Sequence, residues 1–456
     1  MLNLPSAIIT VMTLFAPLFS RPTFLKGVTL MVGHILCKDS RTVTNCLRRV
    51  GLSEERRFSK FHDFFRKAKW SSFKASKLLL FAIDKQWVDT KTIRIVVDTT
   101  LERRRGPRLY GLGIHRDAVM STKKKKVFSS GHNWLVACVL IKFPGTKIFW
   151  SLPFISILLK PKETLSSSKN QKEQSRQRRH KTFIKYTEQL VSLLRRWLGP
   201  NREIILLADS AFCCRSLCRL CQKRKVVLCT QLRLNASLHN FPPPPSGKRG
   251  RPRVVGERLP NLSETAADIN CPWKTQVVSW YGADSHTIEI SSGTALWYHT
   301  TTGKPVPIRW VLTRDPNNQE EVTALLCTNL DCAPKEIIKY FVQRWSIEST
   351  FQEVRGHLGY ETLRTWSDKG IERVSPCIMA SYSIICLIAA KASEEKKEEI
   401  QPLSCAWYDK KHVTFSDVLV YLKLLIINHN VFTHPVKSWV YRKKELYNIM
   451  YWALAG

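Results

Sequence analysis

Two apolar, β-branched runs that each reach an aspartate constrain the fold of this chain more than any other feature. The runs are "TIRIVVDTT", which contains Asp98, and "REIILLADSAF", which contains Asp209. Continuous apolar runs of this length are typical of strands that are buried on both faces. The runs "GHNWLVACVLIKF" and "KIFWSLPFISILL" predict further strands, and residues 179–199 predict an amphipathic helix that ends at Gly199. Strands that alternate with helices indicate an α/β fold.

In an α/β sheet, ligands bind beyond the carboxyl ends of the strands, where both aspartates are expected to lie. A single aspartate at a strand end is most often a turn or cap residue. Two aspartates that both follow fully apolar strands are harder to explain in that way. The sequence therefore predicts that Asp98 and Asp209 belong to one site.

A third acidic residue lies in "YFVQRWSIESTFQEVR", residues 340–355, which we interpret as one helix. On a 3.6-residue period, Phe341, Arg344, Glu348 and Arg355 share a face of that helix. The alternative for Glu348 alone is an ion pair on a solvated surface.

Three carboxylates together can hold two Mg²⁺ ions for attack on a phosphodiester, with Mn²⁺ as an alternative ion. We predict that Asp98, Asp209 and Glu348 are the catalytic and metal-binding residues. Arg344 and Arg355 lack metal-binding oxygens, and we expect them to contact DNA phosphates.

The charge of the chain points to a nucleic-acid partner. Lys and Arg number 72 against 36 Asp and Glu, a formal net charge of +36, while 44% of the residues are hydrophobic. A folded protein with so strong a positive field favours a polyanion, and DNA before a membrane surface. A basic host proteome or a ribosome-associated protein would share this composition.

Residues 1–88 are predicted to be helical. The run "SAIITVMTLFAPLF" is too short to span a bilayer and is broken by Pro17, which favours a buried helix. Ser40 and Ser53 are predicted helix N-caps, and Gly51 is predicted to end the first of these helices. A DNA-binding module and a plain helical bundle with a wet basic face remain equally open. The basic residues that we assign to DNA here are Arg41, Arg48 and Arg49.

The segment "FPPPPSGKRGRPRVVGERLP" interrupts the α/β pattern with a proline-rich basic loop. Its cationic residues could lie in a narrow minor groove, and a solvated linker is the alternative. Four short strands follow, in "TQVVSWYG", "SHTIEI", "TALWYHTT" and "PIRWVLTRDP", which predict a β-rich insertion. The residues assigned to DNA in the loop are Lys248, Arg249, Arg251 and Arg253.

Fourteen cysteines without a secretory signal indicate reduced thiols. Cys218 and Cys221 form a Cys-x-x-Cys pair, but no second ligand pair follows at zinc spacing. We therefore regard structural zinc as the minor alternative.

The sequence resembles the DDE transposases of bacterial insertion sequences whose third acid lies in a Tyr-(2)-Arg-(3)-Glu-(6)-Lys signature. Here the signature is read by Phe341, Arg344, Glu348 and Arg355, with the spacing kept and two residues replaced. Phe341 lacks the hydroxyl, which Tyr340 carries next to it, and Arg355 keeps the charge of lysine. The blocks "LFAPLFSRPTF", "GIHRDAV", "RRHKTF", "LLADSAF" and "RGHLGYETLRTWSDK" extend the resemblance over most of the chain.

The resemblance implies an RNase H-like catalytic core with a β-rich insertion, Mg²⁺-dependent DNA cleavage and strand transfer, and a homodimer on DNA. It also implies a helical region that binds terminal inverted repeats, a bacterial cytoplasmic location at the nucleoid, and base stacking by Trp345. Burial in the core is the more frequent fate of such a tryptophan. Another RNase H-like nuclease and an inactivated or domesticated transposase remain as alternatives.

The expected domains follow from the sequence patterns and from this resemblance. We expect a helical DNA end-binding region over residues 1–88, the RNase H-like core over 89–235 and 321–395, the basic loop and β-rich insertion over 236–320, and a C-terminal helical region over 396–456.

Overall fold

The computed structural model of the protein describes residues 3–38, 40–88, 90–122, 124–161, 180–244, 253–280, 283–300 and 304–433. The chain divides into two compact units. Unit 1 comprises residues 1–89, 99–180 and 348–456, and unit 2 comprises residues 90–98 and 181–347. The predicted α/β class is confirmed, and the large mixed sheet is consistent with an RNase H-like core.

Unit 2 is built on a sheet whose strand order is β1-β5-β6-β11-β10-β9-β7, with β8 paired to β9. The pairs β1–β5 and β5–β6 are parallel, and the pairs from β6 to β9 are antiparallel. The strands are β1 (Thr92–Arg103, of which residues 92–98 belong here), β5 (Glu203–Ala208), β6 (Val226–Leu232), β7 (Leu238–His239), β8 (Lys274–Trp280), β9 (Ala283–Trp297), β10 (Val306–Asp315) and β11 (Asn318–Cys327).

Helices pack on the parallel strands of unit 2 and bury the apolar residues of these strands. Five consecutive residues of β5, from Ile204 to Ala208, are buried. Helix α10 packs on β5 and β6, α8 packs on β6, and α7 packs on α8. The helices and turns of this unit are α7 (Phe183–Leu198), η3 (Ser210–Phe212), α8 (Arg215–Lys223), α9 (Leu262–Ala267) and α10 (Pro334–Arg344).

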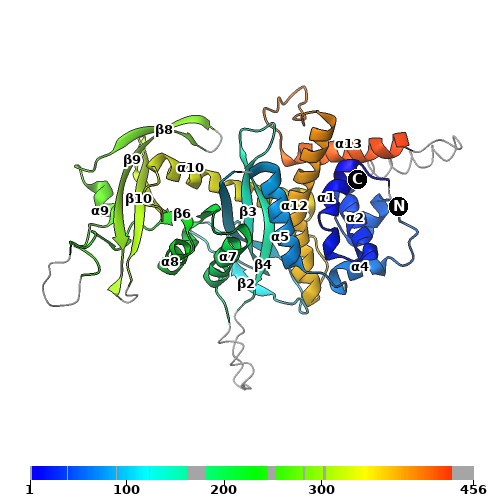
Figure 1. Ribbon diagram of the computed structural model, residues 1–456, viewed down its shortest axis with the longest axis horizontal. Helices are drawn as coiled ribbons and strands as arrows, with labels where there is room; N and C mark the ends of the chain where they lie inside the picture. Colours follow the sequence, from blue (N-terminus) through cyan, green and yellow to red (C-terminus); the bar gives the residue numbers. More distant parts are fainter. Residues whose placement is uncertain are drawn as a thin grey trace, which may run out of the picture. The chain divides into compact units, whose positions relative to one another are not determined.

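Unit 1 combines a small sheet with a helical core. Strand β3 (Phe128–Lys142) pairs antiparallel with β2 (Gly113–Arg116) and with β4 (Phe149–Leu159). Helix α12 packs on β4, α1, α5 and α13, and Figure 1 shows it running between α5 and α1. The helices are α1 (Ser6–Thr13), η1 (Ala16–Leu18), α2 (Arg21–Leu36), α3 (Val43–Arg49), α4 (Ser59–Arg66), α5 (Ser72–Ile83), η2 (Asp84–Val88), α11 (Ser346–Leu358, from residue 348), α12 (Asp368–Lys396) and α13 (Phe415–Thr433).

Among the described residues, α12 is the one helix long and apolar enough to cross a bilayer by length and composition. In its most apolar window 72% of the residues are buried inside the protein. The neighbours of α12 are protein elements on several sides, so its apolar surface is that of a core helix. The predicted burial of the first apolar run is also confirmed, because Ile8 and Val11 of α1 are buried.

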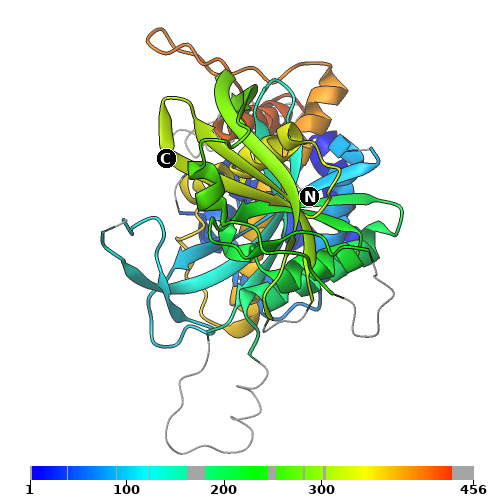
Figure 2. The same cartoon turned by 90° about the vertical axis from the view of Figure 1, so that its left-hand side faces the viewer.

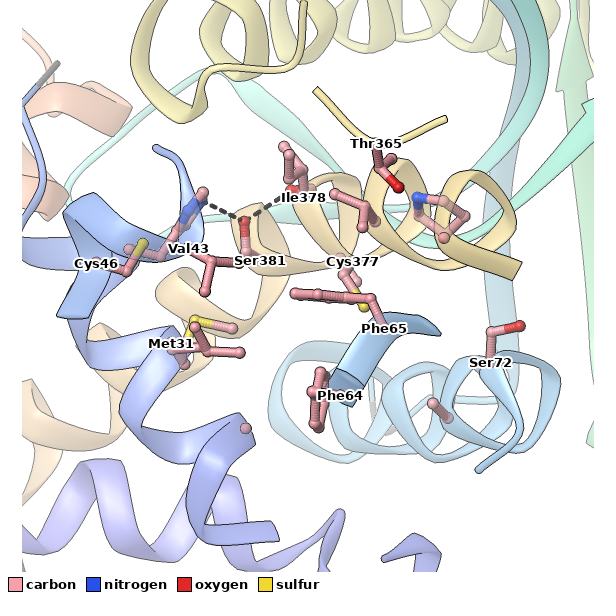
Figure 3. Close-up of a pocket in the computed structure, with 18 of the residues that line it drawn as sticks. Met31, Val43, Cys46, Phe64, Phe65, Ser72, Thr365, Cys377, Ile378 and Ser381 are labelled. Atoms are coloured by element: carbon pink, nitrogen blue, oxygen red, sulfur yellow. Dashed lines mark hydrogen bonds between the residues drawn. The ribbon is translucent and has the colours of Figure 1, made fainter. Parts of the chain in front are cut away.

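The N-terminal helices share a core with α12. A cavity of about 550 Å³ lies among α2, α3, α4, α5 and α12. Figure 3 shows Cys46, Phe64 and Phe65 around this space, facing Cys377 and Ser381 of α12. The Ser381 hydroxyl lies 3.2 Å from Nε2 of His34. Burial lowers the pKa of His34 to about 3, so the imidazole is neutral in this core.

Helix ends in unit 1 correct two of the predicted caps. The N-cap of α3 is Thr42, whose hydroxyl accepts a hydrogen bond from the Asn45 amide, and not Ser40. Helix α4 begins at residue 59 and not after Ser53, because residues 52–58 form turns. Gly51 follows α3 with φ +77°, as a helix-ending glycine does.

Unit 2 confirms the end of α7 at Gly199, which has φ +80°. The two strands predicted in "SHTIEI" and "TALWYHTT" are wrong as separate strands, because β9 is continuous over both. The single helix predicted over residues 340–355 is also wrong. It is two helices, α10 and α11, that break at Trp345, where the amide donates to the Val342 carbonyl three residues back.

A close approach of α2 and α3 generates the first prediction. A Cβ atom at Gly33 would lie 2.4 Å from the Cys46 carbonyl oxygen, whereas a Cβ at Gly356 of α11 meets nothing within 4 Å. We expect Gly33→Ala to lower the free energy of unfolding by about 1–3 kcal/mol through overpacking. Gly356→Ala, the matched control, should raise it by about 0.5–1 kcal/mol. Urea unfolding of both variants tests this, and equal effects would contradict the close approach.

Candidate active site

The pairing of β1 with β5 sets the positions of the two predicted aspartates. The parallel register runs from Thr92 opposite Glu203 to Val97 opposite Ala208. Asp98 and Asp209 are the next residues on the two strands, and both are half-buried. The structure therefore brings the two aspartates to neighbouring positions at the carboxyl end of a parallel pair, as predicted. One detail differs, because β1 continues to Arg103 and Asp98 follows the parallel ladder without ending the strand.

Asp209 is fixed by hydrogen bonds on both of its polar groups. Its side chain caps η3 and accepts the Ser210 amide at 2.5 Å. Its carbonyl oxygen accepts the Thr230 hydroxyl of β6 at 2.8 Å. The turn after β5 therefore holds the carboxylate close to the sheet, and one of its oxygens is committed to the backbone.

Arg344 lies on α10 at the same end of β5. It lines a small cavity together with Ala208, Thr230 and Tyr340, and its side chain is 8% exposed. Its guanidinium carbon is 5.9 Å from the centre of the Phe341 ring. Burial raises the pKa of Tyr340, so this hydroxyl stays protonated and able to donate. The structure therefore brings Arg344 to the carboxyl end of the strand that precedes Asp209.

The other signature residues lie beyond the helix break. Trp345, at the break itself, is 47% exposed and is not a core residue. Glu348 is half-buried in the first turn of α11 and belongs to unit 1, whereas Asp98 and Asp209 belong to unit 2. The predicted single helix through Arg344, Glu348 and Arg355 is therefore divided, with Arg344 at the end of α10 and the other two residues on α11.

Arg355 is bound by its own unit. Its Nη2 atom donates to the Thr100 hydroxyl at 2.5 Å and to the Leu101 carbonyl at 3.2 Å. Its Nε atom donates to Glu361 at 3.3 Å. Because Thr100 follows Asp98 by two residues, Arg355 attaches α11 to the continuation of the strand that carries this aspartate.

A network of ion pairs, which the sequence analysis missed, extends from Glu361. Arg103 of β1 donates to Glu361 at 3.1 Å and to Asp117 at 2.6 Å and 2.9 Å. Asp117 is 1% exposed, and the hydrogen bonds from Arg103 lower its pKa to about 2. The quoted block "GIHRDAV" contains Asp117, but no spacing in the sequence pairs it with Arg103. We call the set Asp117, Arg103, Glu361 and Arg355 the ion-pair network.

A buried cluster beside this network holds the end of β1. Glu102 is fully buried and accepts hydrogen bonds from Arg104 at 3.0 Å, Trp134 at 2.9 Å and Ser375 at 2.9 Å. Burial raises the pKa of Glu102. The three donors are Arg104, directly after β1, Trp134 of β3 and Ser375 of α12. The cluster therefore holds the end of β1 against the core of unit 1.

The donor chemistry of the site fits a hard divalent cation only in part. Carboxylate oxygens at Asp98 and Asp209 are the ligand type that Mg²⁺ prefers. Within the described ranges, no group of three or more His, Cys, Asp or Glu side chains is placed to hold a metal ion. Cys218 and Cys221, the zinc alternative, are buried in α8, and burial raises the pKa of both thiols.

The remaining predicted DNA-binding residues have different surroundings. Arg41 donates to the His34 and Cys37 carbonyls at the end of α2, and so caps that helix. Arg48 is exposed and donates to Asn45, Arg49 is half-buried, and Arg253 is exposed. Lys248, Arg249 and Arg251 lie outside the described residues.

Comparison with known proteins decides the family. A family model described as DDE superfamily endonuclease matches residues 14–293, more than half of the chain. The chain belongs to this family. The matched range contains Asp98 and Asp209 and ends before Glu348. No curated protein sequence gives a significant match to the chain.

Members of the DDE superfamily act on DNA and generally use divalent metal ions. In this DDE superfamily endonuclease, both carboxylates that follow the β1–β5 ladder lie within the matched range. The matched family does not distinguish one insertion-sequence group from another.

The contacts of Arg355 generate a prediction. Arg355→Ala removes donors to three oxygen acceptors and should lower the free energy of unfolding by about 1–3 kcal/mol. Arg355→Lys should lose less, because it keeps the charge but not the planar fork. The control is Arg48→Ala on the surface, with an expected change within about 0.5 kcal/mol. Denaturant unfolding measures all three, and an Arg355→Ala effect no larger than the control would contradict this role.

Asp117 generates a pH-dependent prediction. Its pKa is lowered in the folded protein from 3.8 to about 2, so its carboxylate stabilises the fold by about 2 kcal/mol at pH 7. That stabilisation is fully present above about pH 4 and is lost as the pH falls through about 2. Asp117→Asn should therefore cost about 2 kcal/mol at pH 7 and about half as much near pH 3. Urea unfolding at the two pH values, with exposed Asp331→Asn as the control, measures the difference. A cost independent of pH would contradict the ion pair.

Proposed function

We propose that this DDE superfamily endonuclease is the transposase of an insertion sequence, which cleaves DNA at terminal inverted repeats and joins the ends to target DNA. The register of β1 against β5, which puts Asp98 beside Asp209, is the observation that carries the proposal. Two adjacent carboxylates are not needed to stabilise a sheet whose core is apolar, whereas this end of a parallel sheet is where ligands bind.

Three residues have the role of metal ligands in this proposal. Asp98 and Asp209 supply carboxylate oxygens from the sheet, and Glu348 supplies a third carboxylate from the first turn of α11. Two Mg²⁺ ions, or Mn²⁺ in their place, would supply charge neutralisation and activation of the attacking hydroxyl when bound. The fixed turn at Asp209 keeps one ligand in place before the substrate arrives.

The neighbouring residues have positioning roles. Arg344 is buried at the carboxyl end of β5, in a cavity that restricts the position of its guanidinium group. In this position it orients a phosphate of the DNA. Arg355 positions α11 by its hydrogen bond to Thr100. We propose this positioning role in place of the direct phosphate contact that the sequence suggested. Trp345, whose indole is half-exposed, has the role of stacking on a displaced base.

The partner in this proposal is double-stranded DNA, bound as a homodimer that pairs two ends. The net charge of +36 supports this partner and disfavours self-association without DNA. The exposed Arg48 and Arg253 and the loop residues Lys248, Arg249 and Arg251 are proposed backbone contacts, with Arg49 of α3. A bacterial cytoplasmic location follows from the same function.

Isosteric replacement of the acids tests the proposal. Asp98→Asn, Asp209→Asn and Glu348→Gln should each abolish Mg²⁺-dependent cleavage of a labelled duplex, because each removes a carboxylate charge that the ions require. Binding of the same duplex should be nearly unchanged, since binding depends on the basic surface. Glu257→Gln, at an exposed position, is the matched control and should cleave normally.

The outcomes separate the remaining alternatives. Cleavage that persists in one acid variant removes that residue from the site. Cleavage without joining of ends to target DNA would favour another RNase H-like nuclease. DNA binding by a wild-type chain that neither cleaves nor joins would favour an inactivated or domesticated derivative.

A further inference from the structure

The β2–β3 hairpin of unit 1 exposes apolar and cationic side chains together. Strand β2 pairs with β3 alone among the described strands, and so forms an edge. Figure 2 shows this hairpin in cyan, standing out to the left of the view. We call its exposed cationic and large apolar residues the hairpin surface, which consists of Ile114, Arg116, Val119, Met120, Lys124, Lys125, Lys126 and Phe128.

The register of the hairpin puts part of this surface on one face. Arg116 lies directly opposite Phe128, and Ile114 lies two residues before Arg116 on the same strand. Because side chains alternate along a strand, these three residues point to the same side. Ile114 is 78% exposed and Phe128 is 62% exposed, so none of the described residues covers that side.

Hydrogen bonds within the hairpin hold the described residues of the loop between its strands, 117–122 and 124–127. The buried carboxylate of Asp117 accepts the Met120 amide at 3.2 Å and the Ser129 hydroxyl at 2.9 Å. The Asp117 amide donates to the Val127 carbonyl, and Ser121 exchanges hydrogen bonds with the same residue, Val127. The loop thus holds Val119 and Met120, which are 73% and 59% exposed, in a defined position before any partner binds.

The composition of the hairpin surface selects its partner. Exposed apolar side chains are unfavourable in water and favour a partner with apolar surface, while the lysines favour a polyanion. Duplex DNA offers both, since apolar side chains enter between base pairs from the minor groove while lysines meet the flanking phosphates. A second copy of this chain would bring like charges together, given a net charge of +36.

We propose that the hairpin surface is a DNA-binding wedge, in which Val119 and Met120 enter the base stack and Lys124, Lys125 and Lys126 contact the adjacent phosphates. The inference rests on the proposed function, because it assigns a contact to the DNA that the site would cleave. The ion-pair network gives the contact a route to the site. Asp117, at the base of the loop, connects through Arg103 and Glu361 to Arg355 of α11, the helix that carries Glu348.

Two variants separate the apolar and the charged parts of the wedge. The apolar variant is Val119→Ser with Met120→Ser, and the charge variant replaces Lys124, Lys125 and Lys126 by Gln. Binding is measured by titration of a labelled duplex of random sequence over a range of salt concentrations. The same duplex with 2-aminopurine substitutions reports unstacking by its fluorescence.

Each variant has a matched control at exposed positions of the same unit. The control for the apolar variant is Leu403→Ser, at a side chain that is 54% exposed. The control for the charge variant replaces Lys396, Lys397 and Lys411 by Gln. Thermal melting checks that all variants are folded, which the exposure of the replaced side chains favours.

The two variants should differ in kind. The charge variant should flatten the dependence of log K on log salt by up to about 0.9 for each phosphate that the protein no longer binds. The apolar variant should keep that slope, bind about ten-fold more weakly and lose the 2-aminopurine signal. Effects no larger than those of the controls would overturn the wedge, as would reduced binding to phosphatidylserine vesicles with DNA binding intact. A wild-type chain that binds no duplex would overturn the proposed function itself, and so is a distinguishable result.

Discussion

The parallel pairing of β1 with β5 is the interaction on which the candidate site depends. Apolar side chains from Ile95 to Val97 and from Ile204 to Ala208 are buried between helices and neighbouring strands. Their burial stabilises the sheet and also sets its register, since polar Asp98 and Asp209 are the first residues beyond the apolar runs. A register slip of one residue would displace one carboxylate along the strand by about 3.3 Å relative to the other.

The structure holds β1 on both sides of Asp98 by different means. Before Asp98, the strand is held by backbone hydrogen bonds to β5 and by apolar packing. After it, Arg355 binds Thr100, and Glu102 is held by buried hydrogen bonds from Trp134 and Ser375. Burying Glu102 is unfavourable for its charged form, and the Arg104 ion pair offsets that cost. Such a cluster favours one arrangement of the strand, because any other arrangement would leave a buried polar group without its partner.

The sequence could predict those parts of the fold that periodicity and burial determine. The apolar runs of β1, β3, β4 and β5 predicted strands because continuous apolar runs with β-branched residues are typical of buried strands. The assignment of the two aspartates to one site followed from their positions directly after such runs. The break between α10 and α11 could not be predicted, because residues 341–355 keep helical periodicity across Trp345. The boundary between the two units follows shortly after this break, between Ile347 and Glu348. Periodicity also cannot show that Glu348 and Arg344 belong to different units.

Side-chain pairings that depend on tertiary structure were missed for the same reason. Asp117 and Glu361 are far apart in the sequence, and no spacing connects either of them with their common partner Arg103. Thr42 and Ser40 are both acceptable caps by residue type, and only the backbone at the start of α3 decides between them. Local rules therefore predicted the elements, whereas the contacts that connect them came from the structure.

The positive charge of the chain divides into two classes with different consequences for DNA binding. Several arginines are committed to backbone carbonyls. They are Arg41 at the end of α2, Arg195 in the last turn of α7, and Arg373, which donates to Phe65, Ala68 and Trp70. These residues add to the long-range field that attracts a polyanion, but their guanidinium groups are occupied by the protein. Close phosphate contacts then depend on exposed side chains such as Lys124 and Lys125. The salt dependence of DNA binding should accordingly reflect far fewer contacts than the net charge of +36 suggests, because counterion release counts only the phosphates that are contacted.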